Sequence, residues 1–389
     1  MATTYNYASV PASTTWIEKA AAIGREISAP AAADVDEKAR FPKESLKALA
    51  DQGFLGLCLP KEFGGAGEAP RTFAAVVEEL AQYCGSSAMV YVMHVAASQS
   101  IVASTQYADK SNVLKEIGSG KHLTTLAFSE KGSRSQFWMP CSKLQAHGDA
   151  FSTTAEKSWV TSAGHAQSYV SSAQSPTAGS PMESTLYLVD RTTKGVETVA
   201  PFNGLGLRGN DSAPVQMNNV SIQAGELLTE NGKGADMMLQ VVLPWFVVGT
   251  SAMAHGLCRA AIGATAAHLT GTGFDSGSKL RDLPNLRARL ARMNMRTERS
   301  RALLGLTVAM MEQPTAETPL YVLQSRLSAL ETAVEVTDLA MKACGGAAFS
   351  KHLGIERQFR DARAGWVMAP TVDHLEEFVG RALTGMELF

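Results

Sequence analysis

The feature that most constrains the fold is a change of hydrophobic period near residue 123, and a second change near residue 233. Apolar residues recur at helical spacing before and after these points, as in Arg71–Gln82 and Leu320–Met341. Between them, short segments such as Leu186–Val189 and Val215–Ile222 alternate or run briefly, with Gly, Asn and Pro between them. The pattern predicts a mostly α protein with a central β domain.

The two changes of period also predict where the domains begin and end. We expect an N-terminal helical domain over residues 1–122, a small antiparallel β domain over residues 123–232 and a C-terminal helical bundle over residues 233–389. A Gly pair, Gly345-Gly346, is placed where the longest helix of the bundle should end.

Composition excludes several classes of protein. A net charge of −2 creates no field that would attract nucleic acid or an anionic membrane, and 45% hydrophobic residues suffice for a large core. The five cysteines are scattered, without a CxxC pair, which predicts neither a disulfide framework nor a zinc site. None of the eight histidines lies at metal-ligand spacing, so no metal site is expected.

Targeting and membrane segments are not recognisable. The first residues, Met1–Val10, are polar and lack the apolar region of a signal peptide. The most apolar run, Leu239–Met253, is interrupted by Gln240 and Pro244, which favours a buried helix over a membrane span. We therefore expect a cytoplasmic protein with reduced thiols.

Two short segments of the β domain combine hydroxyl and aromatic side chains. They are Leu126–Glu130 and Lys157–Ser162, and the second contains Trp159. One interpretation is a cofactor cradle. The other is an ordinary strand with a half-buried Trp, in which Ser129 and Thr161 are turn or edge residues.

Other motifs have a structural explanation. Gly204–Gly209 satisfies GxGxxG, but the alternating segment after it predicts a strand where a dinucleotide site requires a helix, so these are turn glycines. The cluster Arg360–Arg363 is typical of ion pairs near a helix end. Trp245, Phe246 and Trp366 are either core residues or the lining of a pocket for an apolar or aromatic substrate.

The order of several motifs resembles that of the acyl-CoA dehydrogenase superfamily over nearly the whole chain. The segment Gly53–Gly65 resembles its N-terminal signature. Ser129–Ser135 resembles its T-E-P-G-A-G-S segment, with Lys131 and Arg134 as departures, and Lys157–Ser162 resembles its K-x-W-I-T-N strand. Further landmarks in the family order are the turn Gly206–Gly209, the pair Gly345-Gly346 and the segment Glu356–Arg363.

The resemblance implies FAD, bound between the β domain and the C-terminal four-helix bundle, and an acyl-CoA or other thioester substrate. It implies that the cofactor is contacted by Leu126, Phe128, Ser129, Ser135, Trp159, Thr161, Thr371 and Asp373. Gly345 and Gly346 would meet the FAD of a neighbouring subunit, which implies a homodimer or homotetramer. The substrate pocket would include Trp245, Phe246, Trp366 and Ala369.

The catalytic base of the family is absent at both positions that the resemblance identifies. The usual glutamate corresponds to Ala369, and the alternative one, in the first helix of the bundle, corresponds to Val242. Loss of a general base typically costs roughly 10²–10⁴-fold in rate. The nearest titratable residues are Asp373 and His374, and the catalytic residue is therefore unknown.

Three functions remain open at this point. The first is oxidation of a thioester at Cα and Cβ without the usual glutamate. The second is a flavin-dependent monooxygenase that uses O₂ on a CoA thioester or an aromatic substrate, in secondary metabolism. The third is a non-catalytic binding module that keeps the fold.

Overall fold

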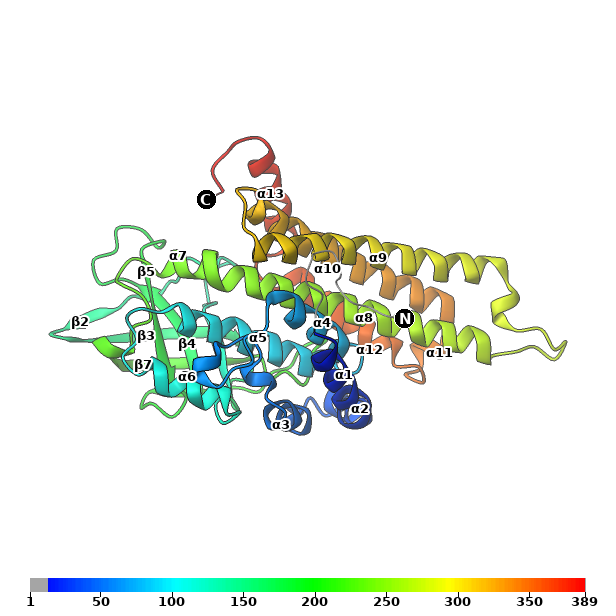
Figure 1. Cartoon of the computed structure of the whole chain (residues 1–389), viewed down its shortest axis with the longest axis horizontal. Coiled ribbons are helices and arrows are strands. Elements are labelled where there is room, and N and C mark those ends of the chain that lie inside the picture. The colour runs from blue at the N-terminus through cyan, green and yellow to red at the C-terminus, as the bar shows by residue number, and fades with distance from the viewer. Residues whose placement is uncertain (1–12, 389) are drawn as a thin grey trace.

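The structure is a computed structural model, and it describes residues 13–388. The segment Met1–Val10, on which the absence of a signal peptide was predicted, lies outside the described residues. Helices of the N-terminal half surround one buried helix, strands form a separate block, and long helices complete the chain (Figure 1). The expected mostly α fold with a central β domain is confirmed.

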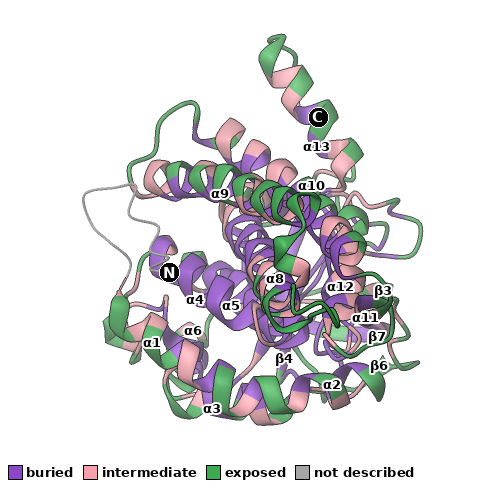
Figure 2. Ribbon diagram, turned by 90° about the vertical axis from the view of Figure 1, so that its right-hand side faces the viewer, coloured by how far each residue is buried: buried purple, intermediate pink, exposed green. Residues whose placement is uncertain are grey.

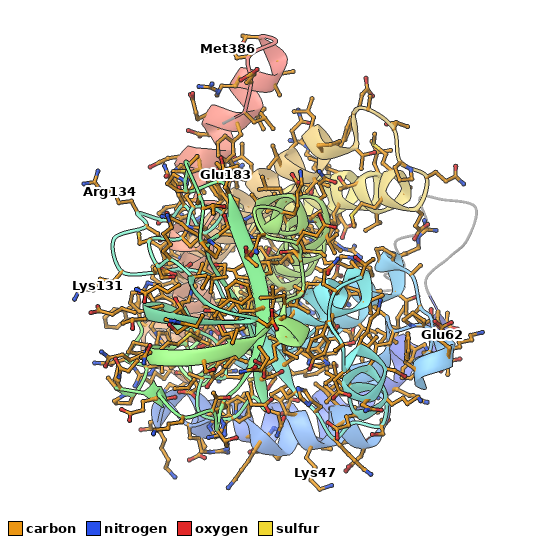
Figure 3. The ribbon with its side chains drawn as sticks, turned by 90° about the vertical axis from the view of Figure 1, so that its left-hand side faces the viewer. Lys47, Glu62, Lys131, Arg134, Glu183 and Met386 are labelled. Atoms are coloured by element: carbon orange, nitrogen blue, oxygen red, sulfur yellow. The ribbon has the colours of Figure 1, made fainter. Side chains whose placement is uncertain are left out.

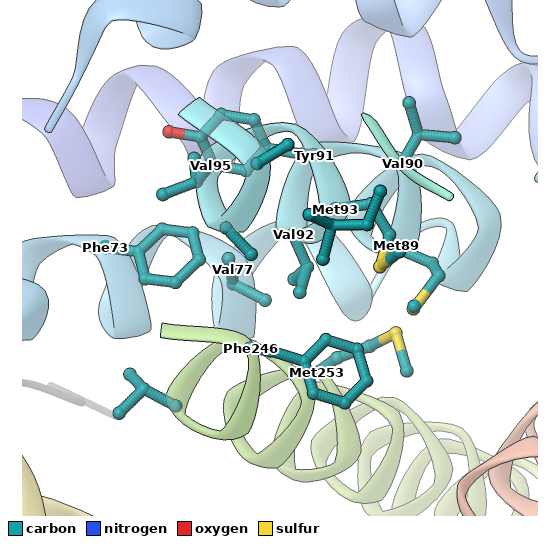
Figure 4. Close-up of a cluster of buried hydrophobic side chains, with 14 of the residues drawn as sticks. Phe73, Val77, Met89, Val90, Tyr91, Val92, Met93, Val95, Phe246 and Met253 are labelled. Carbon is teal, nitrogen blue, oxygen red and sulfur yellow. The ribbon is translucent and has the colours of Figure 1, made fainter. Parts of the chain in front are cut away.

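The N-terminal helices are built around α5, Gly85–Ala103, which is buried along almost its whole length. A helix that is apolar on all sides must be covered on all sides, and α5 packs against α4, α6, α8 and strand β1. Figure 4 shows Tyr91, Val92 and Met93 of α5 above Phe246 of α8, with Phe73 of α4 to their left. The α-helices of this half are α1 Thr14–Ile23, α2 Ala29–Glu37, α3 Lys43–Asp51, α4 Pro70–Ala81, α5 and α6 Lys110–Gly118.

The strands form two small sheets, with the orders β1-β4-β5 and β2-β3-β7-β6. All pairs are antiparallel except β1 with β4, which are parallel. This one parallel pair differs from the all-antiparallel prediction. It is possible because about forty residues separate the two strands, enough for a crossover connection. The strands are β1 Thr124–Ala127, β2 Gln145–His147, β3 Ala150–Val160, β4 Ser168–Gln174, β5 Ser184–Asp190, β6 Val196–Thr198 and β7 Ala213–Gln223.

The C-terminal half is a bundle in which the long helices α8, α9 and α10 pack on one another, and α12 packs on α8 and α10. In Figure 2 the buried surface is concentrated where α8 meets α5 and α4. As the glycine pair predicts, α10 ends at Cys344 and the short α11 begins at Gly346. The helices are α7 Gly234–Met237, α8 Leu243–Gly271, α9 Pro284–Glu312, α10 Thr318–Cys344, α11 Gly346–Phe349, α12 Ile355–Val367 and α13 Val372–Leu383.

The apolar start of the bundle was predicted to be a buried helix. Within the described residues, the segment Gly234–Gly271 is the one helix long and apolar enough to cross a membrane by length and composition. More than half of its most apolar window is buried against other helices of the protein. A core helix passes the same test, so the finding carries no further conclusion.

Before α8 the helix is briefly of π type, over Met238–Val242. Pro244 lacks the N–H group that an α-helical bond to Gln240 would need, and this accounts for the local change of helix type. Val242, which the resemblance aligns with the alternative base, is the last residue of this π segment.

Candidate active site

A cavity of about 780 Å³ lies where the β domain, α5 and the bundle meet. Its lining is mostly apolar at the end formed by α5 and α8, where Met89, Met93, Val242, Leu243 and Phe246 contribute. Polar and charged residues come from the loops 129–135 and 203–212 and from α12. The cavity therefore has an apolar inner part and a polar, cationic side.

The two hydroxyl-and-aromatic segments form one wall of this cavity. They are joined by a backbone hydrogen bond of 2.8 Å, in which the Ser158 N–H donates to the carbonyl of Ser129. Trp159 has a positive φ of 57°, and 69% of its surface is exposed. Its ring and that of Phe202 are nearly perpendicular, with their centroids 6.5 Å apart. The Thr161 hydroxyl lies 2.9 Å from the Ser212 hydroxyl. A strand whose Trp is turned outward into a cavity differs from the ordinary half-buried strand.

A buried ion pair connects these two segments. The Lys157 ammonium donates to a carboxylate oxygen of Glu130 at 2.6 Å and to the Ser172 carbonyl at 2.6 Å. The Cys141 and Ser142 N–H groups donate to the same carboxylate, as does the Ser142 hydroxyl. Burial alone would raise the pKa of Glu130, but the Lys157 charge and these donors hold it below its usual value. Glu130 is therefore an ionised structural group and cannot accept a substrate proton.

The described part of the chain brings no free carboxylate to the cavity lining. Among the described residues that line it, Glu130 is the only acid, and its oxygens are occupied as above. Ala369 and Val242, to which the resemblance assigns the two positions of the family base, both line the cavity. The alternative titratable candidates, Asp373 and His374, do not line it. The ring of His374 instead contacts Trp138 and stacks on Phe378.

Cations are concentrated on the polar side of the cavity. Lys131 and Arg134 lie in the loop after β1, and both side chains point outward from the same face (Figure 3). From α12, Arg363 pairs with Asp338 at 2.6 Å and Arg360 forms a two-bond contact with Asp36. Such groups suit a ligand that carries phosphate.

Asp361 of α12 fixes the turn that carries Gly206. Its carboxylate accepts the Leu207 N–H at 2.6 Å, and burial raises the pKa of Asp361 to about 6. A Cβ atom on Gly206 would lie 2.4 Å from the Arg360 carbonyl oxygen, so only glycine allows this approach. The GxGxxG segment is thus a turn packed on α12, as predicted.

The structure places the predicted site residues in two groups. Those that line the cavity are Leu126, Phe128, Ser129, Ser135, Trp159, Thr161, Phe246, Trp366 and Ala369. Those that do not are Gly345, Gly346, Thr371, Asp373 and Trp245. Trp245 packs on Phe73 with ring centroids 5.7 Å apart, and Thr371 caps the N-terminus of α13. Gly345 and Gly346 lie at the start of α11, near the end of the bundle remote from the strands (Figure 1).

Sequence reasoning missed two parts of the site. Met89 and Met93 line the cavity from α5, and nothing in an evenly apolar helix indicates which face meets a cavity. The Glu130–Lys157 pair was also missed as a contact, although both residues lie inside the quoted motifs. The sequence did contain one signal for this pair. Glu130 is the single charged residue of Leu126–Glu130, and Lys157 is the single charged residue of Lys157–Ser162.

The residues present fit a flavin dinucleotide. The cavity volume suits a ligand of that size, Trp159 offers an uncovered aromatic surface, and Ser129 and Thr161 offer hydroxyl and backbone groups beside it. The cations of the loop after β1 suit a pyrophosphate.

Comparison with known proteins agrees with this fit. Sequence models of the N-terminal, middle and C-terminal domains of acyl-CoA dehydrogenase match residues 13–121, 125–220 and 232–383. A probable acyl-CoA dehydrogenase of Bacillus subtilis, YngJ, is 28% identical over 86% of this chain and 88% of its own. Butyryl-CoA dehydrogenase of Megasphaera elsdenii superposes with a TM-score of 0.90, at 21% identity, over 95% of this chain and 97% of its own. An FAD complex of PigA superposes with a TM-score of 0.88, at 18% identity, over 95% and 97%.

Proposed function

The chain belongs to the acyl-CoA dehydrogenase superfamily, and from this we propose that it is an FAD-dependent oxidoreductase that oxidises an acyl-CoA-type thioester at Cα and Cβ without a carboxylate base in the cavity. The observation that carries the proposal is the cavity itself. It joins a predicted flavin cradle to an apolar pocket, and its lining includes Ala369 and Val242, to which the resemblance assigns the positions of both family bases.

When bound, FAD supplies the acceptor for the two electrons of a hydride. The described residues have other tasks. The segments around Ser129 and Trp159 hold the cofactor, and the Glu130–Lys157 pair fixes the distance between these segments. Cations of the loop after β1, Lys131 and Arg134, neutralise phosphate charge.

Substrate binding is assigned to the apolar part of the cavity. Met89, Met93 and Phe246 bury and orient the acyl chain. No lining residue of the described chain is free to take the α-proton, so the proton passes to water. This requires a substrate whose α-carbon is more acidic than that of a simple saturated acyl thioester.

Anaerobic mixing tests this function. Addition of acyl-CoA substrates to the FAD-loaded protein without O₂ should bleach the flavin absorbance and yield a product two hydrogens lighter. Absence of bleaching with every thioester of a broad panel, including those with acidic α-protons, would contradict the proposal.

The missing base also favours a second candidate, a flavin-dependent monooxygenase that acts on a CoA thioester or an aromatic substrate. That reaction requires no α-proton abstraction, so Ala369 and Val242 are no obstacle to it. In this case bleaching should require an external reductant such as NAD(P)H with a reductase, and the product should gain one oxygen atom from ¹⁸O₂.

We also propose a homodimer or homotetramer. Gly345 and Gly346 do not reach the cavity of their own chain, and next to them Phe349 is 82% exposed. The resemblance assigns the two glycines to the FAD of a neighbouring subunit, and this assignment is the basis of the proposal. Molecular mass in solution tests this proposal, and a monomer in the FAD-loaded state would contradict it.

A further inference from the structure

A buried guanidinium without an acidic partner lies directly behind the cavity. Arg326 of α10 is fully buried, with 0% of its surface exposed. Among the described residues no carboxylate lies within 4.0 Å of it. An unpaired buried charge is costly, and it persists only where other groups compensate for the lost water.

The compensation comes from the cavity wall. The guanidinium donates to the carbonyls of Met368 at 3.1 Å and Pro370 at 3.4 Å, the two residues on either side of Ala369. A third bond goes to the hydroxyl of Thr250, which itself donates to the Phe246 carbonyl at 2.8 Å. The guanidinium carbon also lies over the Phe246 ring, 4.8 Å from its centroid.

Arg326 therefore holds two residues that line the cavity, Ala369 and Phe246, from behind. Burial lowers the pKa of Arg326 to about 9, which leaves the group protonated at neutral pH. A ligand atom in contact with the Phe246 ring would lie within about 10 Å of the charge, given the ring distance and an ordinary contact of about 4 Å. The inner part of the cavity thus has an apolar lining, and the Arg326 charge behind it contributes a positive electrostatic potential there.

Among the described residues, the helices around Arg326 bring no acidic side chain into the cavity lining. On α10, Asp338 pairs with Arg363 at 2.6 Å and Glu335 pairs with Arg296. Repulsion from Glu376 and Glu335 adds to burial in raising the pKa of Glu331. Other charged groups on these helices are Arg259 of α8, Lys342 of α10, Glu356, Arg357, Arg360 and Asp361 of α12, and Asp373, Glu377 and Arg381 of α13. Of these helices, only α12 contributes charged residues to the cavity lining, and both of them, Arg360 and Arg363, are cations.

We propose that Arg326 is a positioning residue that holds the turn around Ala369 and stabilises negative charge on the α-carbon of a thioester bound against Phe246, so that the α-proton is lost without a carboxylate base. Ionisation breaks the α C–H bond, leaves its electron pair in an enolate and transfers the proton to water. The substrate class is then a thioester whose α C–H is acidified by a substituent, such as an α-aryl group, and whose β-carbon still carries the hydrogen that leaves as hydride. A 3-oxoacyl thioester has the acidic α C–H but no β-hydrogen, so it serves as an analogue that ionises without being oxidised. The inference rests on the proposed function, because it assumes that the thioester occupies this cavity.

The test measures the acidity of a bound ligand and needs no turnover. A 3-oxoacyl-CoA is added to the FAD-loaded protein, and its enolate absorbance is followed against pH. In the wild-type protein the bound ligand should ionise at a lower pH than the free ligand. Coulomb's law at about 10 Å with an effective dielectric constant of about 20 gives an effect of roughly tenfold in the acid dissociation constant.

Two variants separate charge from structure. Arg326→Gln removes the charge and should return the ligand acidity about tenfold toward that of the free ligand, whereas Arg326→Lys keeps the charge and should stay close to the wild type. Equal ligand acidity in the wild type and in a folded, FAD-loaded Arg326→Gln protein would overturn the inference.

The remaining outcomes also decide the question. If Arg326→Gln does not fold, the wild type alone is decisive, because an unshifted ligand pKa in the wild type overturns the inference. If the ligand leaves the flavin spectrum of the wild type unchanged at saturating concentration, the thioester does not bind and the proposed function itself fails. The two failures are distinguishable, since the first occurs with a bound ligand and the second without one.

Discussion

Replacement of Lys157 by methionine should destabilise the protein severely, because it leaves a buried carboxylate without its cation. Lys157 and Glu130 expose 0% and 3% of their side chains, and 2.6 Å separates the paired atoms. Removal of one partner from such a pair typically costs about 3–5 kcal/mol of unfolding free energy. Urea denaturation of the FAD-free protein measures this cost. FAD retention should fall in parallel, because the pair joins the two segments of the cradle.

The pH dependence of the free energy of unfolding shows whether the unpaired Glu130 carboxylate causes the loss of stability. In the wild type the pKa of Glu130 is lowered, so its stabilising contribution is present above the unfolded pKa of about 4.3 and is lost as pH falls. In Lys157→Met the carboxylate has lost its cation, and its folded pKa should exceed the unfolded value. Protonation then favours the folded state, and the gap between variant and wild type should narrow from pH 7 toward pH 5.

Matched controls complete the test. Lys131→Met removes the neighbouring exposed cation, whose contact with Glu156 at 3.0 Å is largely solvated, and should change stability little. Lys157→Met combined with Glu130→Gln should be more stable than Lys157→Met alone, because no charge is left unpaired. The reasoning would be refuted if Lys157→Met lowered the free energy of unfolding by less than about 1 kcal/mol, or if the difference from the wild type did not change with pH.

Three further predictions follow from the site. Ala369→Glu should raise desaturation of simple saturated acyl-CoAs by supplying a base, and an FAD-loaded variant without any gain would count against base loss as the limiting defect. Trp159→Ala should weaken FAD binding, read by fluorescence titration, whereas Phe274→Ala, another exposed aromatic outside the cavity, should not; equal losses would exclude a specific cradle role. Asp361 has a folded pKa raised to about 6 against about 3.9 unfolded, so its stabilising contribution is present at low pH and lost as pH rises toward 6. Asp361→Asn should therefore gain up to about 3 kcal/mol relative to wild type between pH 4 and pH 7, and a constant difference in urea unfolding over that range would contradict this.

Much of the fold follows from local pattern. The helical period around Leu320–Met341 and the glycine pair after Cys344 predict α10 and its end, because both signals are local. The parallel pairing of β1 with β4 could not be predicted, because it depends on how a crossover of about forty residues places two short strands whose sequences carry no signal of direction. The turn glycines at Gly204–Gly209 were identified from the strand that follows them, now β7.

The site was less accessible to sequence reasoning. Motif order placed Ser129 and Trp159 in one cradle, which the structure brings together across a single hydrogen bond. It could not place Trp245 and Phe246, adjacent residues of which one packs on Phe73 and the other lines the cavity. Helix rotation decides between them, and Pro244 and the π turn before it alter that rotation. Arg326 gives no sign in sequence that its charge is unpaired, because pairing depends on residues far away in the chain.

A single anaerobic turnover with an isotope-labelled thioester tests the central claim most directly. The FAD-loaded protein is mixed, without O₂, with a 1:1 amount of an activated acyl-CoA deuterated at both Cα and Cβ, and the product mass is measured. The account predicts a product that has lost one deuterium from each carbon while the flavin is bleached. A product that has lost no deuterium from Cβ, or no reaction until O₂ and a reductant are added, would contradict oxidation at Cα and Cβ.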